Sequence, residues 1–332
     1  PRGKKELLGP LSRFAVGDLI AWFSERGVEL KMEDDGRMFP QSNSSETIVN
    51  CFLEEAERLG VEVKLQTEMI RLDKGDQFNI HLANGGMLKA DFLIIAIGGN
   101  PKMKHYEFLK ELGHHVIPPI PSLFTFNLPK HSSNALMGLS LEASVKLTGS
   151  KLEEYGPVLF THWGMSGPAI LKLSSKGAAL LHQKNYQFEY EVRWMETAAE
   201  FISDQRKTNA GVKIGKARPS EFPSRFWSYL LIRAGINEHK NWADLGRSEM
   251  DALHLVLEKD RYQANGKTTF KEEFVTCGGV ELSEINMQRM ESKKQPGLFF
   301  CGEVMNVDAL TGGFNFQAAW TSAWLVSEAL SE

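Results

Sequence analysis

A glycine-rich segment near the end of the sequence has the residue types of a ligand-binding turn. The apolar run 297–301 leads into Gly302 and Glu303, and Gly312 and Gly313 precede a stretch with helical character. Glycines let a planar or phosphorylated ligand approach the backbone closely, and the amides at a helix N-terminus favour negative charge. The segment therefore predicts a nucleotide or flavin site, although a strand–turn–helix whose glycines serve packing would show the same pattern.

A second glycine pair gives a weaker signal. The apolar run 92–97 ends in Gly98 and Gly99, where a strand could pass a phosphate or ribose closely or simply turn. No GxGxxG follows an N-terminal strand, and the sequence begins with Pro1 rather than Met. The sequence therefore resembles an excerpt or a processed product, and the absence of GxGxxG counts against nucleotide binding unless that segment lies upstream of Pro1.

A third segment, 160–169, contains His162 beside Trp163. His162 could donate a proton or a hydrogen bond to a flavin or substrate, although a lone histidine beside a tryptophan is more often structural. Gly164, Gly167 and Pro168 around it indicate a shaped loop that approaches another surface. The sequence Gly-Met-Ser-Gly at 164–167 lacks the second half of a GxSxG elbow, which argues against a hydrolase.

Composition limits the partners. Lys and Arg number 38 against 42 Asp and Glu, a formal net charge of −4, so no global basic field would hold nucleic acid and we expect no nucleic-acid partner. Three cysteines without CxxC or Cys/His spacing predict neither a disulfide framework nor a metal site, and they suit a reducing, cytoplasmic setting. The apolar runs are too short to cross a bilayer, so we expect no membrane partner. The oligomeric state stays open.

The elements that would position these residues follow from periodicity and turn signals. Residues 14–26 and 46–59 predict helices, the second with Asn43 and Glu46 at capping-box spacing. The run 92–97 is continuously apolar, as in a strand buried on both faces of a layered sheet. Further strands are predicted at 61–65, 69–72, 78–82 and 87–90. This mixture indicates an α/β nucleotide-binding domain.

The order of these elements suggests a core domain interrupted by an insertion. We expect a first part of the core domain at 1–118, without its N-terminal βαβ, and a second part at 274–332. A β-rich inserted domain would occupy 119–273, with a helical subdomain near 198–262. The proline-rich stretch 118–121 marks the first boundary.

Taken together and in this order, the motifs resemble those of the BaiN-like (YhiN-like) family of NAD(P)/FAD-dependent oxidoreductases. The resemblance covers nearly the whole sequence and is carried by 36–42, 96–99, 160–174, 276–280, 290–293 and 297–320. The sequence departs from the family pattern in lacking its initial strand, GGGxAG and helix. It also has Asn306 in place of the usual Asp, and Ala309 and Leu310 in place of a glycine-containing turn.

The resemblance implies a two-dinucleotide-binding-type FAD domain that is partial and discontinuous, with the β-rich domain and helical subdomain inserted. It also implies bound FAD, NAD(P)H as electron donor, and hydride transfer to a small-molecule substrate such as an activated alkene. A flavin-free remnant or interaction protein is the alternative. His162 is the expected catalytic residue, and Arg37 and Trp163 are expected substrate or flavin contacts. The expected cofactor-binding residues are Met69, Ala96, Gly98, Gly99, Gly302, Glu303, Asp308, Thr311, Gly312, Gly313, Phe314, Asn315 and Phe316.

Overall fold

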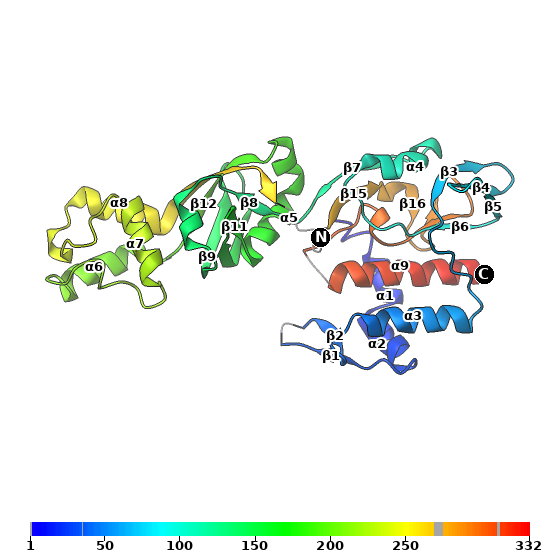
Figure 1. Ribbon diagram of the computed structural model, residues 1–332, viewed down its shortest axis with the longest axis horizontal. Helices are drawn as coiled ribbons and strands as arrows, with labels where there is room; N and C mark the ends of the chain where they lie inside the picture. The colour runs from blue at the N-terminus through cyan, green and yellow to red at the C-terminus, as the bar shows by residue number, and fades with distance from the viewer. Residues whose placement is uncertain (1, 35, 269–274, 311–312) are drawn as a thin grey trace. The chain divides into compact units, whose positions relative to one another are not determined.

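The computed structural model describes residues 2–34, 36–268, 275–310 and 313–332 (Figure 1). The chain divides into two compact units. Unit 1 combines Pro1–Ile120 with Val275–Glu332, and unit 2 is Pro121–Phe274. The first unit is thus built from both ends of the chain, and the second is contributed by its middle.

The central sheet of unit 1 has the strand order β16-β17-β18-β6. Its strands are β16 (Ile285–Asn286), β17 (Glu291–Ser292), β18 (Leu298–Phe300) and β6 (Leu93–Ile95). β18 and β6 are parallel, with Leu298 opposite Leu93 and Phe300 opposite Ile95. The side chains of β18 are buried in the hydrophobic core of this unit together with Phe78.

Unit 1 also contains a three-stranded antiparallel meander and a two-stranded pair. The meander is β3 (Met69–Lys74), β4 (Phe78–Leu82) and β5 (Met87–Ala90), and the pair is β15 (Thr276–Val280) with β7 (Val116–Pro121). β4 and β5 have the predicted bounds. Their connection places Asn84 and Gly85 in the tight turn that the sequence indicated, with Gly85 at φ +83°.

Helices flank these strands, and the longest is α9 (Gly313–Ser331). Its Leu325 and Val326 are buried in the core of the unit. Trp320 packs edge to face on Phe23 at 5.7 Å, and Figure 1 shows α9 running beside α1 and α3. The other helical segments and the small hairpin are α1 (Leu8–Arg13), α2 (Val16–Ser24), β1 (Leu30–Met32), β2 (Met38–Pro40), α3 (Glu46–Arg58), η1 (Met103–Tyr106), α4 (Glu107–Glu111), η5 (Leu282–Glu284) and η6 (Gly302–Val304).

Unit 2 contains a seven-stranded sheet with the order β13-β12-β9-β10-β11-β8-β14. Helix α5 (Pro168–Gln183) packs on β9 and β10, and α6 (Ala198–Thr208), α7 (Ser224–Arg233) and α8 (Arg247–Lys259) gather at one end of the sheet in Figure 1. The strands are β8 (Thr125–Asn127), β9 (Ser140–Leu147), β10 (Glu153–Phe160), β11 (Gly164–Ser166), β12 (Gln187–Arg193), β13 (Asp260–Asn265) and β14 (Lys267–Thr268), with η2 (Ser132–Leu136) and η3 (Trp242–Asp244) in the connections.

Two strand predictions were wrong. Residues 61–65 form no strand: Val61, Val63 and Leu65 are all exposed, and among the described residues no strand lies beside them. The run 92–97 forms only the short β6, which is not buried on both faces. Ile94 is 44% exposed while the next residue, Ile95, is 4% exposed, and since successive side chains point to opposite faces of a sheet, one face of β6 is open to solvent in the described part of the chain. β6 also lies at the sheet edge, with β18 as its one neighbour among the described strands.

The helix predictions were right in place but not in every detail. The predicted helix 14–26 is shorter, as α2, and Gly27 follows it at φ +75° as a C-terminal glycine should. Asn43 does not cap α3, since the N-cap is Ser45 and its side chain makes no capping hydrogen bond. Asn43 instead adopts φ +58° in the preceding turn. No helix among the described residues is long and apolar enough to cross a membrane.

Candidate functional site

The two glycine motifs leave the sheet of unit 1 side by side. β6 and β18 are parallel and in register, so the turn at Gly98 and Gly99 and the turn at Gly302 and Glu303 emerge from the same, carboxyl edge. In open α/β sheets, ligands bind outside the carboxyl ends of the parallel strands. The structure therefore brings together four predicted cofactor residues that are about 200 positions apart in sequence.

Gly99 is in close contact with two other segments of the site. The Gly99 N–H donates a hydrogen bond to the carboxylate of Glu303. A Cβ built on Gly99 would lie 2.6 Å from Thr276 Oγ1 and 3.0 Å from Glu303 Oε2. Thr276 is fully buried, and its hydroxyl has no hydrogen-bond partner among the described residues. Only glycine fits here, and an unpaired hydroxyl remains beside the carboxylate.

Burial and charge both act on Glu303. Desolvation raises the pKa of this carboxyl, the charge of Asp308 raises it further, and the hydrogen bond from Gly99 opposes both effects. Asp308 is itself buried and forms an ion pair with Arg2. A half-buried carboxylate with these neighbours is a strong acceptor for ligand hydroxyls.

Tyr106 supports the first glycine turn and was not found from the sequence. Its side chain is fully buried, and its hydroxyl accepts a hydrogen bond of 2.9 Å from the Asn100 N–H, one residue after Gly99. Thr276 was likewise noted only as part of a longer motif. The sequence gives no signal that connects either side chain to a turn formed elsewhere in the chain.

The second group of predicted cofactor-binding residues lies at the start of α9. Gly313 opens the helix, and an added Cβ would meet no atom of the described residues within 4 Å. Asn315 is buried and accepts a 3.0 Å hydrogen bond from the Ala309 N–H, which fixes the preceding turn. Phe316 is 60% exposed and stacks on Trp320, with ring centroids 5.4 Å apart. Thr311 and Gly312 lie outside the described residues.

The remaining predicted cofactor residues lie in varied surroundings. Ala96 is exposed after β6, and Gly98 adopts φ +72°. Met69, at the start of β3, and Phe314 both pack against the hydrophobic core of unit 1. Arg37, in the turn between β1 and β2, has its guanidinium 3.9 Å from Glu33.

His162 and Trp163 belong to unit 2. His162 is exposed in the turn between β10 and β11, and its ring lies 3.5 Å from that of Trp163. The inference drawn from the neighbouring glycines was wrong. A Cβ on Gly164 would lie 2.0 Å from the Phe126 carbonyl oxygen, so this glycine is required by strand packing inside the unit.

The same correction holds for the rest of that segment. A Cβ on Gly167 would lie 2.7 Å from the Pro157 carbonyl oxygen, and Pro168 occupies the first position of α5. Proline is favoured there because its missing N–H would have no intrahelical partner. The exposure of His162 is compatible with a role toward substrate, and the glycines add nothing to that case.

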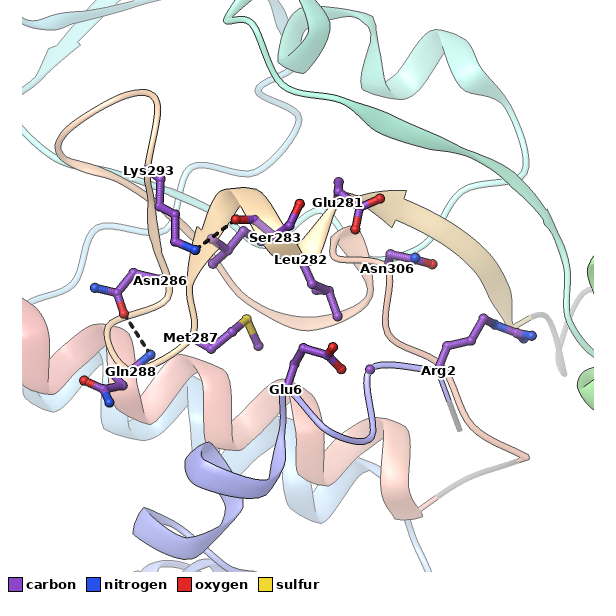
Figure 2. Close-up of a pocket in the computed structure, with 12 residues that line it drawn as sticks. Arg2, Glu6, Glu281, Leu282, Ser283, Asn286, Met287, Gln288, Lys293 and Asn306 are labelled. Atoms are coloured by element: carbon purple, nitrogen blue, oxygen red, sulfur yellow. Dashed lines mark hydrogen bonds between the residues drawn. The ribbon is translucent and has the colours of Figure 1, made fainter.

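A separate cavity of about 570 Å³ lies on unit 1 between the N-terminal segment and the chain around η5 (Figure 2). Its lining includes Arg2, Glu6, Glu281 and Lys293, and Lys293 Nζ donates a 2.9 Å hydrogen bond to the Ser283 carbonyl. None of the predicted cofactor residues lines it. Its basic and acidic side chains balance, so charge selects no ligand class.

Comparison with known proteins defines the class. A family model described as the HI0933-like protein Rossmann domain matches residues 1–329, and the chain belongs to this family of FAD-dependent oxidoreductases. The predicted resemblance to BaiN-like proteins is thereby confirmed.

The individual relatives are enzymes. The chain is 30% identical to "Ribosomal RNA dihydrouridine synthase" of Escherichia coli (strain K12), over 96% of this chain and 80% of the relative. It is 28% identical to the protein of the same name from Haemophilus influenzae, over 97% and 81%. It is 23% identical to "3-dehydro-bile acid delta(4,6)-reductase" of Clostridium scindens, over 97% and 82%.

Proposed function

We propose that this protein is a flavin-dependent reductase that uses FAD and NAD(P)H to reduce a carbon–carbon double bond conjugated to a carbonyl group. The observation that carries the proposal is the contact between Gly99 and Glu303 at the carboxyl ends of two parallel strands. This arrangement suits a ligand that has both a flat surface and several hydroxyls.

The residues of this site fit FAD. Glu303 would accept hydrogen bonds from the cofactor's hydroxyls, and the unpaired hydroxyl of Thr276 is available beside it. Gly98, Gly99 and Gly302 would allow close approach, and the start of α9 at Gly313 would favour negative charge. When bound, FAD supplies two-electron transfer as hydride, while the protein positions and tunes it.

The pyrophosphate is assigned to a segment outside these 332 residues. The sequence contains no GxGxxG, and no other described strand pairs with the outer edge of β6, which would accept a further strand. A strand, glycine loop and helix placed there would bring the helix N-terminus to the same carboxyl edge.

The acceptor class follows from what the named relatives have in common. Forming dihydrouridine reduces the C5–C6 double bond of a uracil ring, which is conjugated to a carbonyl. A delta(4,6)-reductase of a 3-dehydro bile acid reduces double bonds conjugated to the 3-oxo group. Such a reduction adds hydride at one carbon and a proton at the other. His162, exposed in its turn, is the proposed proton donor.

The test is acceptor-dependent oxidation of NADH and NADPH by the FAD-loaded protein that carries this additional strand, glycine loop and helix. 2-Cyclohexen-1-one serves as a small conjugated acceptor, and purified ribosomal RNA serves as the uracil-containing one. We expect at least one acceptor to be reduced in step with NAD(P)H consumption. Failure to retain FAD, or NAD(P)H oxidation that never depends on an acceptor, would support the alternative of a flavin-free interaction protein.

A further inference from the structure

One stretch of sequence in the helical part of unit 2 contains several cations and no acid. Between Asp204 and Glu221 the chain has five basic residues and no acidic one. The formal net charge of the whole chain is −4, so this segment departs from the average of the molecule. We call it the cationic segment; its basic residues are Arg206, Lys207, Lys213, Lys216 and Arg218.

All five side chains are exposed, and the three lysines form no ion pair within the described part of the chain. Neighbouring Lys240, in contrast, bonds to Glu249 at 2.7 Å. One acid does lie beside the turn: a Cβ built on Gly215 would be 3.5 Å from Glu238 Oε2, and this carboxylate accepts a 2.9 Å hydrogen bond from the Ser228 hydroxyl. The positive charge of the segment is thus mostly uncompensated.

The turn that carries Lys213, Lys216 and Arg218 is held rigidly. Trp227 Nε1 donates a 2.8 Å hydrogen bond to the Ile214 carbonyl, and Trp242 Nε1 donates one of 3.3 Å to the Ala217 carbonyl. Both indoles belong to fully buried side chains. A backbone fixed in this way has less conformational entropy to lose when its side chains bind a partner.

We infer that the cationic segment is a docking surface for the phosphate backbone of structured RNA. Phosphate contacts act locally, through the cations that reach the backbone and release its counterions, so an acidic average charge does not oppose them. This revises the expectation of no nucleic-acid partner, which rested on that average. The inference rests on the proposed function, since it supplies the RNA that would carry the conjugated ring to be reduced.

The experiment measures the affinity for purified Escherichia coli ribosomal RNA, between 50 and 300 mM salt, of the FAD-loaded protein extended by the strand, glycine loop and helix described above. Affinity for heparin is measured as a control, because heparin is a polyanion that has neither bases nor ribose. The test variant combines Lys207→Gln, Lys213→Gln and Lys216→Gln. The control combines Lys151→Gln, Lys172→Gln and Lys184→Gln, three exposed lysines of unit 2 outside the segment. Reduction of 2-cyclohexen-1-one is followed in parallel.

We expect the test variant to bind ribosomal RNA about 10- to 100-fold more weakly. A plot of log affinity against log salt concentration should have a slope that is less steep by about 3. The control should change either quantity little, and both variants should keep their FAD and enone reduction. Equal losses in both variants, unchanged affinity in the test variant, or equal affinity for heparin and RNA would overturn the inference. Absence of FAD or of reductase activity would count against the proposed function, and the affinities would still test the surface.

Discussion

The carboxyl of Glu303 lies among groups that favour its protonated form. Burial and Asp308 raise its pKa above the ordinary 4.5. A carboxyl with a raised pKa in the folded state contributes stability that is fully present below pH 4.5 and is lost as the pH rises through the raised value. At neutral pH the charge of Glu303 therefore destabilises the FAD-free protein, while the same charge would strengthen hydrogen bonds from cofactor hydroxyls.

Replacing Glu303 should accordingly raise the stability of the FAD-free protein while lowering its affinity for FAD. We expect Glu303→Gln without FAD to unfold at a higher temperature than wild type at pH 7–8, with the difference vanishing near pH 4. FAD affinity should fall about 10- to 150-fold, the loss for a hydrogen bond to a charged group. Thermal unfolding over this pH range and FAD titration measure the two effects. Glu107→Gln, at an exposed position, is the control; a destabilised Glu303→Gln would contradict the electrostatic argument.

His162 is the residue that the proposal makes a proton donor. General acid catalysis typically contributes about 10²–10⁴-fold, so His162→Ala should slow reduction of the acceptor by that order. FAD content should stay unchanged, and flavin reduction by NAD(P)H should change less. Stopped-flow measurement of the two half-reactions separates these steps. His182→Ala removes another exposed histidine of unit 2 and should leave both steps intact. Equal effects of the two substitutions would rule out the assigned role.

At the scale of elements, Gly99 lies where the turn after β6 packs against β15 and the turn after β18, and a side chain at this position would clash with both. Gly99→Ala would place a methyl group 2.6 Å from Thr276 Oγ1, and relieving such a clash typically costs about 1–3 kcal/mol. We expect a lower melting temperature and weaker FAD binding. Gly75→Ala, where an added Cβ meets nothing and φ is not positive, should be nearly neutral. Wild-type behaviour of Gly99→Ala would mean that the described contact is not tight.

At the start of α9 we expect the opposite effect on stability, because a side chain added at Gly313 should leave folding intact. Gly313 is in a helix, and a Cβ added there meets none of the described residues within 4 Å, so Gly313→Val should fold nearly as well as wild type. It should still obstruct FAD, because a branched side chain there would fill the space next to the proposed cofactor. Gly17→Val, also near the start of a helix and in open space, is the matched control and should retain FAD. Loss of folded protein in Gly313→Val alone would show that this glycine serves packing.

The sequence predicted elements whose signals are local. Turn residues and alternation gave β4 and β5 their bounds, and Gly27 marked the end of α2. Residues 61–65 and β6 were misjudged because a strand is defined by its neighbours, and apolar runs do not show whether a neighbour exists. The glycines at 164 and 167 were misread for a related reason: their requirement comes from carbonyls on β8 and β10, far along the chain.

The residues of the candidate site also divide into those with a local sequence signal and those that depend on distant neighbours. The sequence singled out Gly98, Gly99, Gly302 and Glu303 because their motifs combine an apolar run with glycines, and the structure brings these four residues together. Thr276 and Tyr106 were not assigned roles, since their importance arises only when β15 and η1 fold against those turns. At this scale, long-range packing determines which polar atoms remain unpaired.

At the scale of the whole molecule, the proposed function requires both halves of a cofactor cradle. In that proposal the chain would provide Glu303, the glycine turns and the start of α9, and its sequence lacks GxGxxG. The most direct test is the FAD content, by visible absorption after gel filtration, of two proteins: these 332 residues alone, and the same residues preceded by a strand–GGGxAG–helix segment of the family. We predict close to one FAD per chain in the extended protein, lost on Glu303→Gln, and little FAD in the 332 residues alone. An extended, folded protein that elutes without FAD would contradict the assignment of this site to a flavin, and stoichiometric FAD in the shorter chain would contradict the need for the added segment.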